Sequence, residues 1–143
     1  MKYAELCEVY EQLQKNPSRL KKVEIIADFL KKLPSEDTSD LLYLLKGKIF
    51  PDYSEKEMGI SEKLVIKSLS RASGTPDKEI VLLWKKRGDL GNVAEEIISK
   101  KKQHTLFSHR LSVEKVIDTL KKLPSLTGKG PVDKKLSLLS ELL

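Results

Sequence analysis

The spacing of apolar residues predicts helices almost throughout the chain. Leucine, isoleucine, valine and aromatic side chains recur every three or four positions, which is the period of a helix with one apolar face. Stripes of this kind lie within residues 3–13, 20–30, 41–45, 64–69, 80–84, 90–98 and 113–120, and a last helix begins near residue 131. No segment shows a convincing strand pattern. We therefore expect an all-α fold, a multi-helix orthogonal bundle without a sheet.

Residues that start or stop helices mark the predicted boundaries. Gly74 is placed to close the fourth helix, and Thr75-Pro76 then reads as an N-cap and first-turn pair. Asp89 and Ser112 are each expected to cap the helix that follows them. Between residues 48 and 59 the pattern predicts a connector, with a possible one-turn helix at 54–57.

The apolar residues of the second and the last helix lead to two further predictions. In the second helix, Leu20, Val23, Ile26, Ala27 and Leu30 are predicted to face the core. The last helix is rich in leucine up to residue 143 and shows no cap or polar tail. This end favours a chain cut from a longer parent, or a helix that packs on something absent; the alternative is a terminal helix folded back on the core.

Composition limits the class of protein. The chain has 143 residues, enough for one domain over 1–143. Its 27 Lys and Arg against 21 Asp and Glu give a net charge of +6, which favours a polyanionic partner. Cys7 is the single cysteine, so a disulfide framework is excluded. No signal peptide or membrane-spanning run is apparent, so we expect a cytoplasmic, nucleoid-associated monomer without membrane contact.

Three glycine-marked turns, each with lysine or arginine nearby, suggest a function. They are 59–63, 87–91 and 127–131, and the last is followed by Lys134 and Lys135. A helix start exposes unpaired N–H groups and the positive end of the helix dipole, which suits a phosphate oxygen. Glycine also allows a nucleic-acid backbone to come close. The alternative is that these turns are ordinary helix caps.

In order and spacing, several segments resemble the N-terminal part of ATP-dependent DNA ligases of the archaeal and eukaryotic type. They are Asp28-Phe29-Leu30, Phe50-Pro51, 57–64, 88–95 and 126–130 with Lys134-Lys135. The resemblance implies the first half of an all-helical domain that holds nicked double-stranded DNA through the minor groove and phosphates, without reading sequence. The parent enzyme would act in DNA replication, repair and recombination.

The resemblance also implies which residues contact DNA. The set is Gly59, Ser61, Lys63, Lys67, Gly88, Gly91, Gly128, Lys129, Gly130, Lys134 and Lys135. Ser61 replaces a glycine usual in the family, and its hydroxyl can instead cap a helix or bind phosphate. Pro131 stands where relatives often have serine, which removes one hydroxyl contact.

The residues for catalysis are missing from these 143. The family's nucleophile is a lysine in Lys-x-Asp-Gly, and only Lys86-Arg87-Gly88-Asp89 approaches this motif, with the last two residues reversed. A P-loop and a metal-ligand cluster are also missing. We expect this segment to have no catalytic residues, no metal and no cofactor, whereas the parent enzyme would use ATP and Mg²⁺.

The loop after residue 100 carries a second signal. Gln103, Leu106 and Phe107 fit a shortened form of the peptide by which archaeal members of the family bind a sliding clamp of the PCNA type, in which apolar anchors fill a pocket. Alternatively, Leu106 and Phe107 pack in the core. The sequence thus leaves open a helical interaction module that mainly recruits a clamp, or an unrelated helical adaptor whose lysines are solvated surface.

Overall fold

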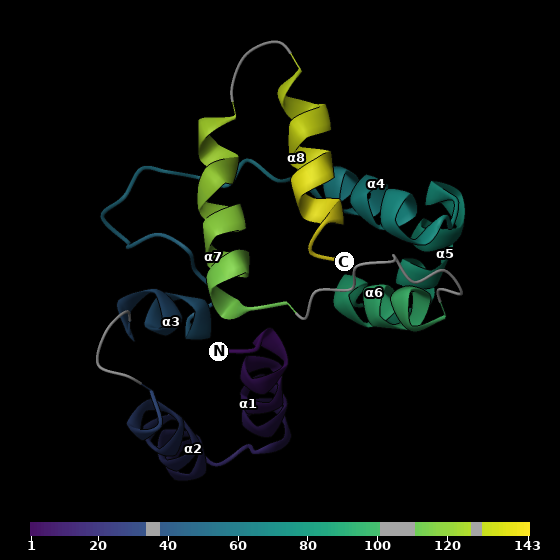
Figure 1. Cartoon of the computed structure of the whole chain (residues 1–143). Helices are drawn as coiled ribbons and strands as arrows, with labels where there is room; N and C mark the ends of the chain where they lie inside the picture. Colours follow the sequence, from purple (N-terminus) through teal and green to yellow (C-terminus); the bar gives the residue numbers. More distant parts are fainter. Residues whose placement is uncertain (34–37, 101–110, 127–129) are drawn as a thin grey trace. The chain divides into compact units, whose positions relative to one another are not determined.

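The computed structural model describes residues 1–33, 38–100, 111–126 and 130–143, and these contain helices and no strand (Figure 1). In chain order the elements are α1 Tyr3–Lys15, α2 Arg19–Lys31, α3 Thr38–Leu45, α4 Glu62–Ser73, α5 Asp77–Arg87, α6 Leu90–Ser99, α7 Val113–Lys122, the 3₁₀ turn η1 Leu123–Ser125 and α8 Pro131–Ser140. The all-α expectation is confirmed. None of the described helices is long and apolar enough to cross a membrane.

The chain divides into two compact units, and each combines two separate stretches of sequence. The first contains Met1–Lys56 and Arg110–Lys121, and the second contains Glu57–His109 and Lys122–Leu143. The first unit therefore holds α1, α2, α3 and most of α7, whereas α4, α5, α6 and α8 belong to the second.

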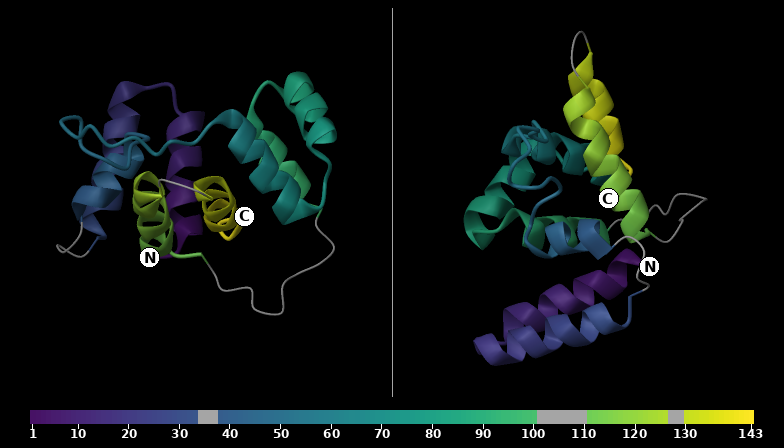
Figure 2. Two further views of the ribbon diagram at one scale, coloured as in Figure 1. Left: turned by 90° about the horizontal axis from the view of Figure 1, so that it is seen from above. Right: turned by 90° about the vertical axis from the view of Figure 1, so that its left-hand side faces the viewer.

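In the first unit, α1 and α2 form an antiparallel pair joined by a short turn (Figure 2). Leu6 is fully buried on α1, and Phe29 is buried on α2. Hydrogen bonds tie the start of the chain to the start of α7: the Tyr3 N–H donates to the Leu111 carbonyl at 2.8 Å, and the Val113 N–H donates to the Met1 carbonyl at 3.0 Å. The chain's first turn is thus held by residues more than a hundred positions later.

The second unit packs around an apolar core supplied by three helices. Ile66 and Leu69 come from α4, Ile80 from α5, and Val93 and Ile97 from α6, and all five are buried. The 3.6-residue period fixes which side chains meet here, since Ile66 and Leu69 lie three positions apart on one face of α4. This core holds in place the helix that carries the predicted DNA-binding lysines.

Most predicted caps are confirmed. Gly74 closes α4 in the left-handed conformation, with φ +75°. Asp89 Oδ1 accepts the Asn92 N–H at 2.8 Å, and Ser112 Oγ accepts the Lys115 N–H at 3.1 Å. The fifth helix differs by one residue: Pro76 is its N-cap, and Thr75 makes no capping bond to it.

Two local expectations were wrong. Leu20 and Val23 on α2 are 83 % and 58 % exposed, whereas the other three predicted residues, Ile26, Ala27 and Leu30, are half-buried beside the buried Phe29. The apolar stripe of this helix is broad, and periodicity alone does not decide which edge of it packs. The one-turn helix at 54–57 is also absent; Ser54 Oγ only accepts the Lys56 N–H at 3.3 Å.

The cap on α6 gives a first testable prediction. Asp89→Ala should lower the free energy of unfolding by about 1 kcal/mol, because the Asn92 N–H loses its acceptor. Asp89→Asn keeps an oxygen in the same place and should cost much less. Urea unfolding of the two variants measures the difference; equal losses would show that the side-chain oxygen is not the stabilising group.

Candidate nucleic-acid interface

The first predicted turn lies at the start of α4 and is open to solvent. Gly59 is exposed and left-handed, with φ +60°, a conformation that glycine adopts without steric cost. Ser61 is the N-cap, and its Oγ accepts the Leu64 N–H at 3.2 Å. The Ser61 hydroxyl therefore serves as a helix cap, the first of the two roles that the sequence allowed.

Cations line the solvent face of α4. Lys63 and Lys67 are exposed and four residues apart, so they lie one turn from each other on the same face. Arg71 continues this row by another four residues and is also exposed. Among the described residues, no carboxylate forms an ion pair with any of the three. Their charges are available to an outside anion.

The turn before α8 adds a second helix start to this surface. Gly130 is its N-cap, with φ +86°, and no side chain caps the helix. Pro131 occupies the first helical position, where a missing N–H costs no helical bond. Lys134 is exposed and has no carboxylate partner among the described residues.

One hydrogen bond joins the α4 turn to α8. Lys135 Nζ donates to the Gly59 carbonyl at 3.1 Å. Further along, Ser140 Oγ lies 3.3 Å from the Ser68 carbonyl, and Ser68 is buried. These small side chains allow the two helices to pack closely, and both views of Figure 2 show α8 beside α4. We call the surface formed by the α4 and α8 starts with Lys63, Lys67, Arg71, Lys134 and Lys135 the α4–α8 surface.

The third turn, between α5 and α6, is chemically different. Gly88 ends α5, and its N–H donates to the Trp84 carbonyl at 2.8 Å. The carboxylate of Asp89 occupies the start of α6 through the Asn92 N–H. A carboxylate at a helix N-terminus offsets the dipole that would otherwise attract phosphate. Gly91 is exposed in the first turn of α6.

Two of the cations near this third turn, Arg87 and Lys100, are paired, whereas Lys85 and Lys86 are exposed without an ion pair among the described residues. Glu96 accepts hydrogen bonds from Arg87 Nη2 at 2.7 Å and from Lys100 Nζ at 2.8 Å. The bonds from Lys100 and Arg87 hold the pKa of the Glu96 carboxyl below its usual value. The first turns of α4 and α8 also carry a carboxylate each, Glu62 and Asp133; the start of α6 differs in that its carboxylate is the N-cap itself.

The structure thus brings together part of the predicted site. Two packed helices, α4 and α8, and the turns before them carry Gly59, Ser61, Lys63, Lys67, Gly130, Lys134 and Lys135. Within the described ranges, no hydrogen bond or ion pair joins Gly88 or Gly91 to that group. Gly128 and Lys129 lie outside the described residues, as do Gln103, Leu106 and Phe107. Arg71 was not among the predicted residues, although its four-residue spacing from Lys67 places it in the same row of exposed cations.

Comparisons with known proteins decide the family. A family model described as "DNA ligase N terminus" matches residues 2–143. The chain belongs to this family. It is 46 % identical over 143 residues to a DNA ligase of Methanosphaera stadtmanae and 41 % identical over 142 residues to a DNA ligase of Thermococcus onnurineus. These alignments cover 98 % and 99 % of this chain but 26 % and 25 % of the relatives, so the chain spans about a quarter of their length.

Gly59 allows a test of the link between the two helix starts. A Cβ at this position would lie 2.7 Å from Lys135 Nζ, so Gly59→Ala should displace that ammonium group. The left-handed backbone adds a cost of about 1 kcal/mol in the free energy of unfolding. Under the DNA-binding hypothesis raised by the sequence, the affinity for DNA should fall by up to about tenfold at 0.1 M salt, which is the contribution of one phosphate contact.

The matched control is Gly74→Ala. Gly74 has a φ of +75° and nothing within 4 Å of an added Cβ, so its variant carries the backbone strain without displacing a lysine. Both variants should lose similar stability in urea, while only Gly59→Ala loses affinity in a DNA titration. Equal affinities for the two variants would show that Gly59 and Lys135 do not contribute to DNA binding.

Proposed function

We propose that this chain binds duplex DNA at nicks, without sequence preference, through the α4–α8 surface. The observation that carries the proposal is the bond from Lys135 Nζ to the Gly59 carbonyl at 3.1 Å, because it joins two helix starts whose exposed lysines have no partner among the described carboxylates. Helix starts and ammonium groups are the features that phosphate oxygens favour. Membership of the DNA ligase N-terminus family supports DNA as the partner.

The proposed contacts are made to the phosphate groups of the DNA backbone. Lysine side chains and backbone N–H groups position a duplex but do not distinguish bases. Ser61 keeps the first turn of α4 ordered, and Gly59 and Gly130 leave the backbone accessible, since neither carries a Cβ. Binding should thus depend on charge and on the shape of the duplex backbone.

A titration on nicked duplex DNA at two salt concentrations tests this function. For about four phosphate contacts, the affinity should fall by on the order of 10²-fold between 0.05 and 0.2 M salt, because bound counterions are released. Duplexes of unrelated sequence should give the same constants. Binding that does not respond to salt, or no binding at 0.05 M, would exclude the electrostatic mechanism.

For the whole enzyme we propose ATP-dependent joining of DNA strands, with Mg²⁺, in replication, repair and recombination. The 143 residues contain no Lys-x-Asp-Gly motif, so in this proposal the lysine that takes up AMP lies elsewhere and this chain supplies DNA binding. Clamp docking through Gln103, Leu106 and Phe107, and a monomeric state, stay predictions of the sequence. Phe107→Ala should abolish clamp binding while leaving the melting curve unchanged, if that loop docks a clamp.

A further inference from the structure

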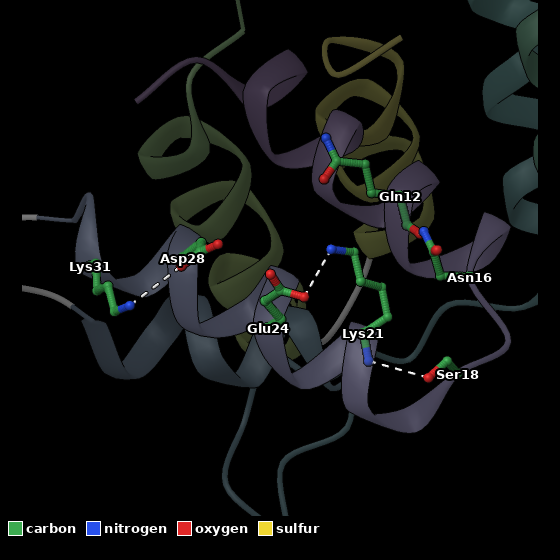
Figure 3. A network of polar contacts seen from close by, with 7 residues as sticks. All are labelled: Gln12, Asn16, Ser18, Lys21, Glu24, Asp28 and Lys31. Atoms are coloured by element: carbon green, nitrogen blue, oxygen red, sulfur yellow. Dashed lines mark hydrogen bonds and ion pairs between the residues drawn. The ribbon is translucent and has the colours of Figure 1, made fainter.

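The first unit contains a groove that the proposed DNA binding does not use. It runs between α1 and α2 and has a volume of about 890 Å³, within the range of sites that hold a ligand or a peptide anchor. Its floor is apolar: Val9 and Phe29 are 9 % and 8 % exposed, and Ile25 and Leu33 also line it. Figure 3 shows the two helices that form its walls.

The rim of the groove is acidic in a chain that is otherwise basic. Glu5 and Glu8 contribute from α1, and Glu24 and Asp28 contribute from α2. These four carboxylates are accompanied by two lysines, Lys21 and Lys32, and by the N-terminal ammonium of Met1, while the whole chain has a net charge of +6. The local sign is opposite to that of the α4–α8 surface.

Ion pairs neutralise rim charges of both signs, since Lys31 Nζ also lies 3.4 Å from Asp28 Oδ1 (Figure 3), and they leave Glu5, Glu8 and Lys32 without an ion-pair partner among the described residues. Lys21 Nζ bonds to Glu24 Oε2 at 2.8 Å (Figure 3), and the Met1 ammonium bonds to Glu114 Oε1 at 3.0 Å. Glu5 and Glu8 are exposed, and neither has an ion-pair partner in the part of the chain that the structure describes. Two free carboxylates therefore stand beside an apolar floor.

The end of the groove adds hydrogen-bonding groups. Gln12 and Asn16 line it from the last turn of α1, and Asn16 Nδ2 donates to the Gln12 carbonyl at 2.7 Å. Because the rim is acidic, DNA and anionic lipid are disfavoured here, and a cationic ligand with apolar groups is favoured.

We propose that the α1–α2 groove docks a basic amphipathic peptide segment of a partner protein. Apolar side chains of the peptide would pack on the half-buried Ile25 and Leu33, while its lysines or arginines pair with Glu5 and Glu8. An amphipathic helix laid in an apolar groove is a common mode of peptide recognition, and rim charges of opposite sign select the partner. This site is independent of the proposed DNA binding.

A designed peptide pair tests the proposal on the full 143-residue chain. The probe is a fluorescent 16-residue peptide in which leucine and lysine are spaced so that a helix has one apolar and one basic face. The control peptide has glutamate at every lysine position. We expect fluorescence polarisation to show binding of the lysine peptide only. Amide chemical-shift changes in an ¹⁵N-labelled chain should be confined to α1 and α2.

Charge-reversing variants locate the interaction. Glu5→Lys with Glu8→Lys should weaken peptide binding by about tenfold or more, and Glu5→Gln with Glu8→Gln by a smaller factor. The matched control is Glu79→Lys with Glu95→Lys: both residues are exposed, Glu79 is in the first turn of α5 as Glu5 is in that of α1, and the net charge change is the same. The control should retain the original affinity, and all three should melt as the unchanged chain does.

Several outcomes would overturn the proposal. Equal binding of the two peptides would show that the rim charges do not select a partner. Equal losses in the Glu5/Glu8 and Glu79/Glu95 variants, or shifts centred on α4 and α8, would indicate general charge attraction. Dimerisation in sedimentation experiments, with shifts in α1 and α2 and no peptide present, would assign the groove to a second copy of this chain.

Discussion

Replacing Lys63, Lys67 and Lys134 together by glutamine should weaken binding to nicked duplex DNA by on the order of 10²-fold at 0.1 M salt. Each lysine that contacts a phosphate releases a counterion and contributes about 0.9 to the salt slope. All three are exposed and have no described carboxylate partner, so no existing ion pair has to break before they bind. The slope of log affinity against log salt should therefore fall by nearly three.

The control for this variant removes the same charge elsewhere in the second unit. Lys78, Lys85 and Lys86 are exposed on α5, and their joint replacement by glutamine should change the affinity far less. If both triple variants lost affinity equally, binding would depend on total charge and not on the α4–α8 surface. Unfolding in urea checks that neither variant has lost its fold.

The second large effect is expected in the core that supports α4. Leu69→Ala should lower the free energy of unfolding by about 2–5 kcal/mol, because the side chain is 1 % exposed and its removal leaves a cavity beside Ile80 and Val93. Such a loss is a large fraction of the stability of an ordinary domain, about 5–15 kcal/mol. Trp84 is the single tryptophan and packs against this core, so its fluorescence during urea unfolding reports the change.

Leu82→Ala is the matched control for Leu69→Ala. Leu82 is 66 % exposed on α5, so the same chemical change should stay within about 0.5 kcal/mol. A loss below about 1 kcal/mol for Leu69→Ala would show that the second unit repacks around the missing side chain.

Much of the fold could be predicted from the sequence because caps and periodicity are local signals. Gly74, Asp89 and Ser112 mark helix ends through bonds within three or four residues, and such bonds do not depend on distant parts of the chain. The face of α2 could not be predicted in this way. Whether Leu20 or Phe29 packs inward depends on where α1 lies, which is a tertiary property.

The candidate site was predictable in composition but not in arrangement. The glycines and lysines of the turns could be read directly, yet the sequence gives no sign that Lys135 reaches back across 76 residues to the Gly59 carbonyl. The third turn shows a second way in which the sequence was insufficient. Its glycines look like those of the other two turns in the sequence. In the structure, however, Asp89 caps the helix and Glu96 forms ion pairs with both Arg87 and Lys100.

The interleaved connectivity of the two units has a consequence for how the molecule is made. The first unit needs residues up to 121 and the second resumes only at 122, so a chain leaving the ribosome can complete neither until most of it has been synthesised. Contacts between residues so far apart in sequence also slow folding. A single protease cut within 57–109 would break the backbone inside the second unit. It would also separate the two sequence stretches of the first unit, which would then be held together only by hydrogen bonds and packing.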